Sequence, residues 1–170
     1  KSVQAWADNA ALAFGQSKQQ ALDAAATFAT FGKAAGLTGQ DLESFATDFV
    51  GLSSDLASFN NTSPEQAIQA IGAALRGESE PLRAYGVLLD DASMRQKALE
   101  LGIIDNIKNA LTPQQKVLAA QALIYEQTSA AQGDFARTSD GLANQQRILD
   151  AQMENLKATI GQALLPVVLA

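Results

Sequence analysis

Hydrophobic residues recur at helical spacing along most of the chain, and the strongest repeat lies between residues 42 and 59. Alternating steps of three and four residues place large apolar side chains on one face of an α-helix. We call this set the first stripe: Leu42, Phe45, Phe49, Leu52, Leu56 and Phe59. A face without polar groups predicts a seam packed against other helices, either within the chain or in a second copy, and packing within the chain is our first expectation.

A second repeat lies near the C-terminus, with Gln, Asn, Asp, Glu and Lys on the opposite face. We call it the second stripe: Leu142, Leu149, Met153, Leu156, Ile160 and Leu164. It predicts a helix that begins after Ser139 and Asp140 and ends at Pro166. At ~1.5 Å per residue such a helix measures on the order of 40 Å. Like the first stripe, it could pack within the chain or against a second copy.

Cap residues divide the rest of the chain into separate helices. Their side-chain oxygens accept hydrogen bonds from unpaired N–H groups, often with Gln or an acidic residue three positions later. A first helix is expected from Val3 to Gly15, with Trp6 on its core face, and Gly32 and Gly36 mark the end of the second helix. Gly51 is expected to mark a close helix crossing. Caps are expected at Ser17, Thr38, Ser63, Ser79, Asp90 and Thr112.

The chain is expected to fold as an elongated all-α assembly of capped helices. Residues 63–104 would form a compact joint, in which 87–89 is a buried connector that could pair as a short strand with 103–104. The expected segments are 1–60 with the first stripe, 61–111 with short helices, and 112–170 with long amphipathic helices. They form one continuous module.

Composition supports the all-α fold class and excludes several kinds of catalytic and metal site. Apolar residues make up 47% of the 170 positions and aromatic residues only 6%, which favours closely packed helices over sheet. The net charge of −6, without a basic cluster, disfavours sequence-specific nucleic-acid binding. Cysteine and histidine are absent, which removes thiol catalysis, imidazole bases and Cys/His zinc sites. A start at Lys1 and an apolar last stretch predict a fragment of a longer protein.

Four acidic residues form the one cluster that suggests a reaction. Glu78, Glu80, Asp90 and Asp91 could include a general acid and a general base of the glycosidase kind. Each also stands at a helix start, where it can cap or favour the helix dipole, and Arg76 and Arg83 can pair with them. The structural roles are the stronger expectation. No catalytic residue, cofactor site or metal site is therefore assigned.

Three blocks of the chain have a specific wording. They are LASFNNTSPEQAIQAIGAALRGESEPLRAYGVLLDDA from Leu56, LTPQQKVLAAQALIYEQTSAAQGDFARTSDGLANQQRIL from Leu111, and MENLKATIGQALLPV from Met153. The most specific runs within them are LRGESEPLR and QGDFARTSDGLANQQRIL. These blocks, which cover most of the chain, resemble the tape measure proteins of long-tailed bacteriophages and prophages, particularly those of actinobacterial hosts.

The resemblance implies a helical structural protein, located in the virion within the tail tube or at its tip. Some members of this family carry embedded peptidase or muramidase domains, but the motifs on which those depend do not occur in this sequence, so no enzymatic activity is expected. It would set tail length during assembly in the host cytoplasm and take part in genome ejection. Implied partners are further copies of the chain, trimers especially, the tail tube protein, distal tail and baseplate proteins, tail assembly chaperones, and the host membrane during ejection. The two stripes would serve self-association.

Two other functions stay open. The cell-wall-cleaving module of a tail protein is the first alternative, and it depends on the four acids alone. A secreted helical adaptor is the second.

Overall fold

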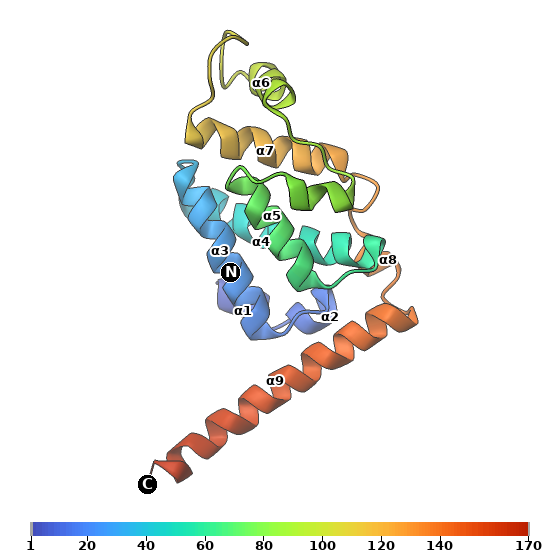
Figure 1. Cartoon of the computed structure of the whole chain (residues 1–170). Coiled ribbons are helices and arrows are strands. Elements are labelled where there is room, and N and C mark those ends of the chain that lie inside the picture. The colour runs from blue at the N-terminus through green and yellow to red at the C-terminus, as the bar shows by residue number, and fades with distance from the viewer. Residues whose placement is uncertain (1, 170) are drawn as a thin grey trace.

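The computed structural model of the protein describes residues 2–169, and it confirms the all-α fold class (Figure 1). No strand is present in this range. The α-helices are α1 (Val3–Ala7), α2 (Ala10–Phe14), α3 (Lys18–Ala34), α4 (Gly39–Asn60), α5 (Pro64–Leu75), α6 (Asp91–Glu100), α7 (Pro113–Gln127), α8 (Asp134–Arg137) and α9 (Leu142–Val168), and a 3-10 helix, η1 (Glu80–Tyr85), follows α5.

The core forms where α4 crosses α3 and meets α5 and α7. Phe49 of α4 is fully buried. The centroid of its ring lies 5.4 Å from that of Phe28 in α3, 5.0 Å from that of Phe45 and 5.3 Å from that of Tyr125 in α7. Aromatic rings at these separations attract each other beyond the free energy of burying their area. Phe49 therefore links three helices that lie far apart in the sequence.

Small residues let α3 and α4 approach each other. A Cβ atom on Gly32 would lie 2.6 Å from Leu42 Cδ1 and 3.0 Å from Phe45 Cδ1, so a side chain there would displace Leu42. Gly32 is thus inside α3 and does not end it, contrary to the expectation. The tight crossing occurs here rather than at Gly51, where an added Cβ would make an ordinary contact with Phe14.

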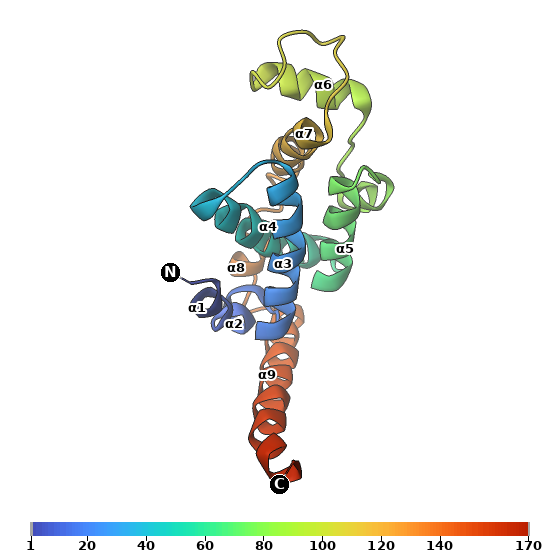
Figure 2. The same ribbon diagram turned by 90° about the vertical axis from the view of Figure 1, so that its left-hand side faces the viewer.

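The predicted joint is not a separate unit in space. Its first helix, α5, packs on α4, and Ile71 and Leu82 belong to the main core. The rest of the joint, around α6, packs on α7 and forms the top end of the molecule (Figure 2). A small second cluster holds that end together: Ala98, Ile104, Leu111 and Ala119.

The predicted helix caps have three outcomes. Full capping boxes join Ser63 with Gln66, Asp90 with Ser93 and Thr112 with Gln115, so these three starts are confirmed. Ser17 makes half of its box, by accepting from the Gln20 N–H at 3.1 Å. Thr38 and Ser79 occupy the N-cap positions of α4 and η1 as predicted, but their side chains make no capping hydrogen bond.

The expected first helix is broken in two. Asp8 and Asn9 separate α1 from α2, and both residue types compete for local hydrogen bonds outside helices. In an unbroken helix Trp6 and Phe14 would lie about 12 Å apart along the axis. The break brings their ring centroids to 5.6 Å, so the rings pack together.

The connector at residues 87–89 is not a strand. Val87 is buried, but the segment does not pair with residues 103–104. Instead, the side-chain amide of Gln127 accepts from the Leu88 N–H at 2.8 Å and donates to the Leu88 carbonyl at 2.9 Å. One glutamine thus satisfies the backbone groups for which the sequence suggested a strand.

The C-terminal part also differs from the expected boundaries. The helix from Thr112 ends at Gln127, and the short helix α8 intervenes. The last helix, α9, begins at Leu142, after Ser139 and Asp140 as predicted, although Gly141 is its N-cap. Pro166 does not stop α9, which continues to Val168. Proline removes one hydrogen bond there, but the helix ends within a turn, so little regular structure is lost.

We expect Phe49→Asp to lower the free energy of unfolding by about 3–5 kcal/mol, because it places an unpaired charge in the core. Phe59→Asp is the matched control from the same stripe. Phe59 is 53% exposed, so its replacement should change stability by no more than about 0.5 kcal/mol. Urea unfolding followed by circular dichroism measures both. Equal stability of the two variants would contradict the assigned core.

Candidate functional site

The two apolar stripes have different surroundings. In the first stripe, Phe45, Phe49, Leu52 and Leu56 are buried within the chain, Leu42 is half-buried and Phe59 is exposed. Nearly all of this stripe is therefore core. Phe59 instead lines a surface hollow together with Leu142, the first residue of α9.

The second stripe is exposed along its whole length. The side chains are between 46% and 87% exposed, although all of them are large and apolar: Leu142, Leu149, Met153, Leu156, Ile160 and Leu164. They form the largest regular set of exposed apolar residues in the described chain. Contiguous apolar surface of this kind usually marks an interaction site.

Polar side chains attach α9 to the helical body. Arg147 donates to the carbonyl oxygens of Thr62 at 2.9 Å and Ala57 at 3.5 Å, and to Asn144 Oδ1 at 2.7 Å. Asn144, which is buried, donates to Ser58 Oγ at 2.9 Å and Thr138 Oγ1 at 2.8 Å. These bonds fix the direction in which α9 leaves the body.

The contact ends about halfway along α9. Ile148 and Ala151 are buried, and Asn155 Oδ1 accepts from the Lys18 N–H, the first in α3, at 2.8 Å. From Leu156 to Leu169 every residue is exposed, and this half projects from the body as a single helix (Figure 1).

Close packing also occurs at Gly15, where α2 ends near α8 and α9. A Cβ atom added to Gly15 would lie 2.9 Å from the ring of Phe135.

The four acids of the catalytic alternative have structural partners. Three of them form ion pairs with arginines. The distances are 3.9 Å from Glu78 Oε1 to Arg76 Nε, 3.2 Å from Glu80 Oε2 to Arg83 Nη1, and 2.8 Å from Asp91 Oδ2 to Arg95 Nη2. Asp90 caps α6 through the Ser93 N–H at 2.7 Å, and this bond holds the pKa of its carboxyl below the usual value. The contacts thus match the expected capping and pairing roles.

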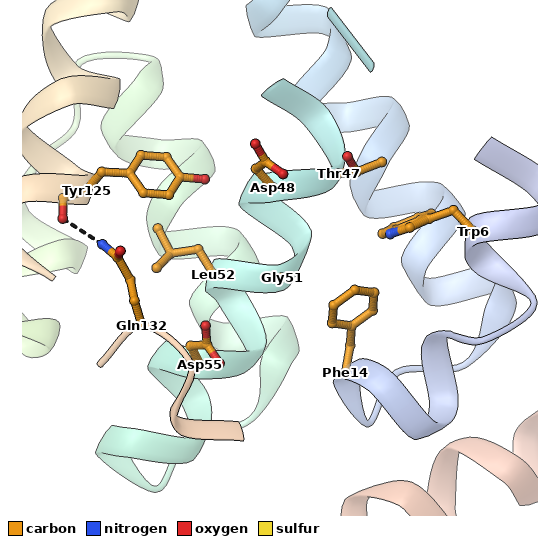
Figure 3. Close-up of a pocket in the computed structure, with 9 residues that line it drawn as sticks. All are labelled: Trp6, Phe14, Thr47, Asp48, Gly51, Leu52, Asp55, Tyr125 and Gln132. Atoms are coloured by element: carbon orange, nitrogen blue, oxygen red, sulfur yellow. Dashed lines mark hydrogen bonds between the residues drawn. The ribbon is translucent and has the colours of Figure 1, made fainter. Parts of the chain in front are cut away.

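A cleft of ≈ 420 Å³ lies between α1, α2, α4 and α7 (Figure 3). Trp6 and Phe14 form an aromatic wall on one side, and Tyr125 and Gln132 lie on the other. Asp48, Gly51 and Asp55 come from α4 between them; the remaining lining residues are Thr47 and Leu52. No sequence pattern indicates this cleft, because its walls are distant in the chain.

Asp55 has a structural role in the cleft. Its carboxylate accepts from the Gly133 N–H at 2.8 Å and the Phe135 N–H at 3.1 Å, so it caps α8 from another helix. Burial raises the pKa of the Asp55 carboxyl, and the two backbone hydrogen bonds oppose that rise. Sequence inspection misses this cap, because the acid and the helix it caps are about 80 residues apart.

Tyr125 is the other polar group held in this cleft. Its ring packs on Phe49, and its hydroxyl has no hydrogen-bond partner among the described residues. Burial, followed by the charges of Asp48 and Asp55, raises the pKa of Tyr125. A phenol that keeps its proton serves poorly as a base, so Tyr125 is not a candidate for that role.

Two further observations concern metals and membranes. Residues 2–169 hold no group of three or more acidic side chains placed to bind a metal ion. Within the same range, no helix combines the length and apolar character that crossing a membrane requires.

Comparison of the chain with known protein families, curated protein sequences and solved structures finds no match.

We expect Asp55→Ala to lower the free energy of unfolding by about 1–2 kcal/mol, since it leaves two N–H groups at the start of α8 without their acceptor. Asp48→Ala is the control, because Asp48 lines the same cleft and caps no helix; its effect should stay within about 0.5 kcal/mol. Chemical unfolding gives both values. Hydrogen exchange should also quicken at residues 133–137 in the first variant alone, and unchanged exchange there would contradict the cap.

Proposed function

We propose that this chain is a segment of a phage tail tape measure protein, a structural component of the virion. The specific sequence blocks carry the proposal. The helical fold is compatible with it, and so is α9, whose outer half extends away from the body as a helix of the kind that can span distance in proportion to residue number. Its role is to occupy the tail lumen, to help set tail length and to take part in ejection.

The proposal includes partners of several kinds. The chain associates with copies of itself, for which the resemblance implies a trimer, and contacts the tail tube protein and distal tail proteins. Tail assembly chaperones hold it in the host cytoplasm before assembly. The exposed second stripe supports these contacts, because it leaves a long apolar surface without a partner inside the chain.

Immunogold labelling of intact and opened virions tests the location. Antibodies against residues 2–169 should label tails only after these are opened, and quantitative mass spectrometry should find far fewer copies than of the tail tube protein. An in-frame deletion of this segment should shorten the tails or abolish them. Labelling confined to capsids, or a copy number equal to that of the tube protein, would refute the proposal.

A peptidoglycan assay tests the cell-wall-cleaving alternative. The purified chain should release no soluble fragments, because each of the four acids has a structural partner. The Glu78→Gln/Glu80→Gln double variant is the control for trace hydrolase contamination. Release of fragments by the parent chain, and not by this variant, would favour the enzyme instead.

A further inference from the structure

The apolar stripe of α9 has the heptad spacing of a coiled coil. Leu142, Leu149 and Leu156 recur every seven residues at d positions, followed by Ala163. The a positions that alternate with them are Gln146, Met153, Ile160 and Val167. The repeat covers nearly four heptads, a length at which such spacing argues for a coiled coil when charges flank the seam at e and g. Asp150 and Lys157 are the charges at those positions here.

The helical body leaves this seam free. Every a, d, e and g position between residues 142 and 167 is exposed. The α9 residues that the body does cover all fall at b, c and f positions: Asn144, Arg147, Ile148, Ala151 and Asn155. At about 100° per residue, the centres of the two faces lie roughly 150° apart around the helix. A partner helix on the seam would therefore meet no obstruction from the body.

The residues that flank the seam permit a second copy in parallel orientation. In a parallel pair in register, each g position lies beside the e position five residues later in the partner helix. These pairs join Gln145 with Asp150 and Gln152 with Lys157, so each charge meets an amide and no like charges meet. Asp150 already accepts from Gln146 Nε2 at 2.8 Å within its own helix.

The seam residues favour two strands. β-branched residues at a, here Ile160 and Val167, combined with leucine at d, favour dimers over trimers. Gln146 is the single polar a residue, and in a parallel pair in register it meets its own copy, where two amides can bond to each other. In an antiparallel pair it would face Ala163 instead, so its amide would lack a partner. A lone polar a residue is known to fix register in this way.

We propose that α9 pairs with α9 of a second copy as a parallel, two-stranded coiled coil along Leu142, Leu149, Met153, Leu156 and Ile160. The pair would direct the two bodies outward on opposite sides. This rests on the self-association part of the proposed function, for which it names the surface and the orientation, and it places two strands where the resemblance implies three. It is tested in solution without phage, so its failure and the failure of the virion proposal are distinguishable.

Sedimentation equilibrium of the 170-residue chain gives the first test. The mass should rise with concentration from 17.8 kDa to twice that value. Leu156→Glu/Ile160→Glu should remain monomeric with unchanged unfolding of the body, because both side chains are exposed. Ala158→Glu, at an exposed f position, is the matched control and should dimerise as the parent does. A monomer at every concentration, or a three-chain species, overturns the two-stranded pair.

Single cysteines give the orientation, and the chain has none of its own to interfere. Under oxidation, Leu156→Cys should form a disulfide-linked dimer, since position 156 lies beside its own copy in a parallel pair. Ala158→Cys should crosslink at least tenfold more slowly. Crosslinks that form only in mixtures of Met153→Cys with a tagged Leu156→Cys would show antiparallel pairing and overturn the proposal, as would equal rates at positions 156 and 158.

Discussion

Close packing of α3 against α4 is the constraint on which the rest of this fold depends. Gly32 lets the side chains of Leu42 and Phe45 lie against the backbone of α3, and the rings of Phe28, Phe45 and Phe49 pack together at the crossing. Tyr125 brings α7 onto the same ring cluster. Because interiors are packed at nearly crystalline density, the positions of α5 and α7 follow from that of α4. The ends of the molecule, α6 and α9, are attached to this centre.

The two ends are attached by different interactions. The α6 end has a small apolar cluster of its own, which includes Ala98 and Leu111. By contrast, α9 is joined largely through hydrogen bonds from Asn144 and Arg147 to backbone and hydroxyl groups of the body. This polar attachment leaves the apolar face of α9 unused. The arrangement agrees with a chain whose function lies in contacts with other chains, and it gives the proposed structural role a specific surface.

The features of the fold that the sequence predicts correctly depend on residues close together in the chain. Helix starts at Ser63, Asp90 and Thr112 involve residues three positions apart, so the local sequence is enough to define them. Interactions across the chain were not foreseen. Gln127 satisfies the connector at Leu88, and Asp55 caps α8, in each case from a distant helix. The cleft beside Asp55 escaped prediction for the same reason, since its walls come from four helices.

By itself, the sequence determined the all-α class, most helix positions and both apolar stripes, because periodicity and capping act within one or two turns. Only the tertiary structure decided which stripe the chain covers. The first stripe became core when α3, α5 and α7 closed over Phe49 and Leu56, while the second stayed exposed because α9 meets the body with its opposite face. Both stripes have the same kind of spacing, and the choice between them depends on contacts between residues far apart in the chain.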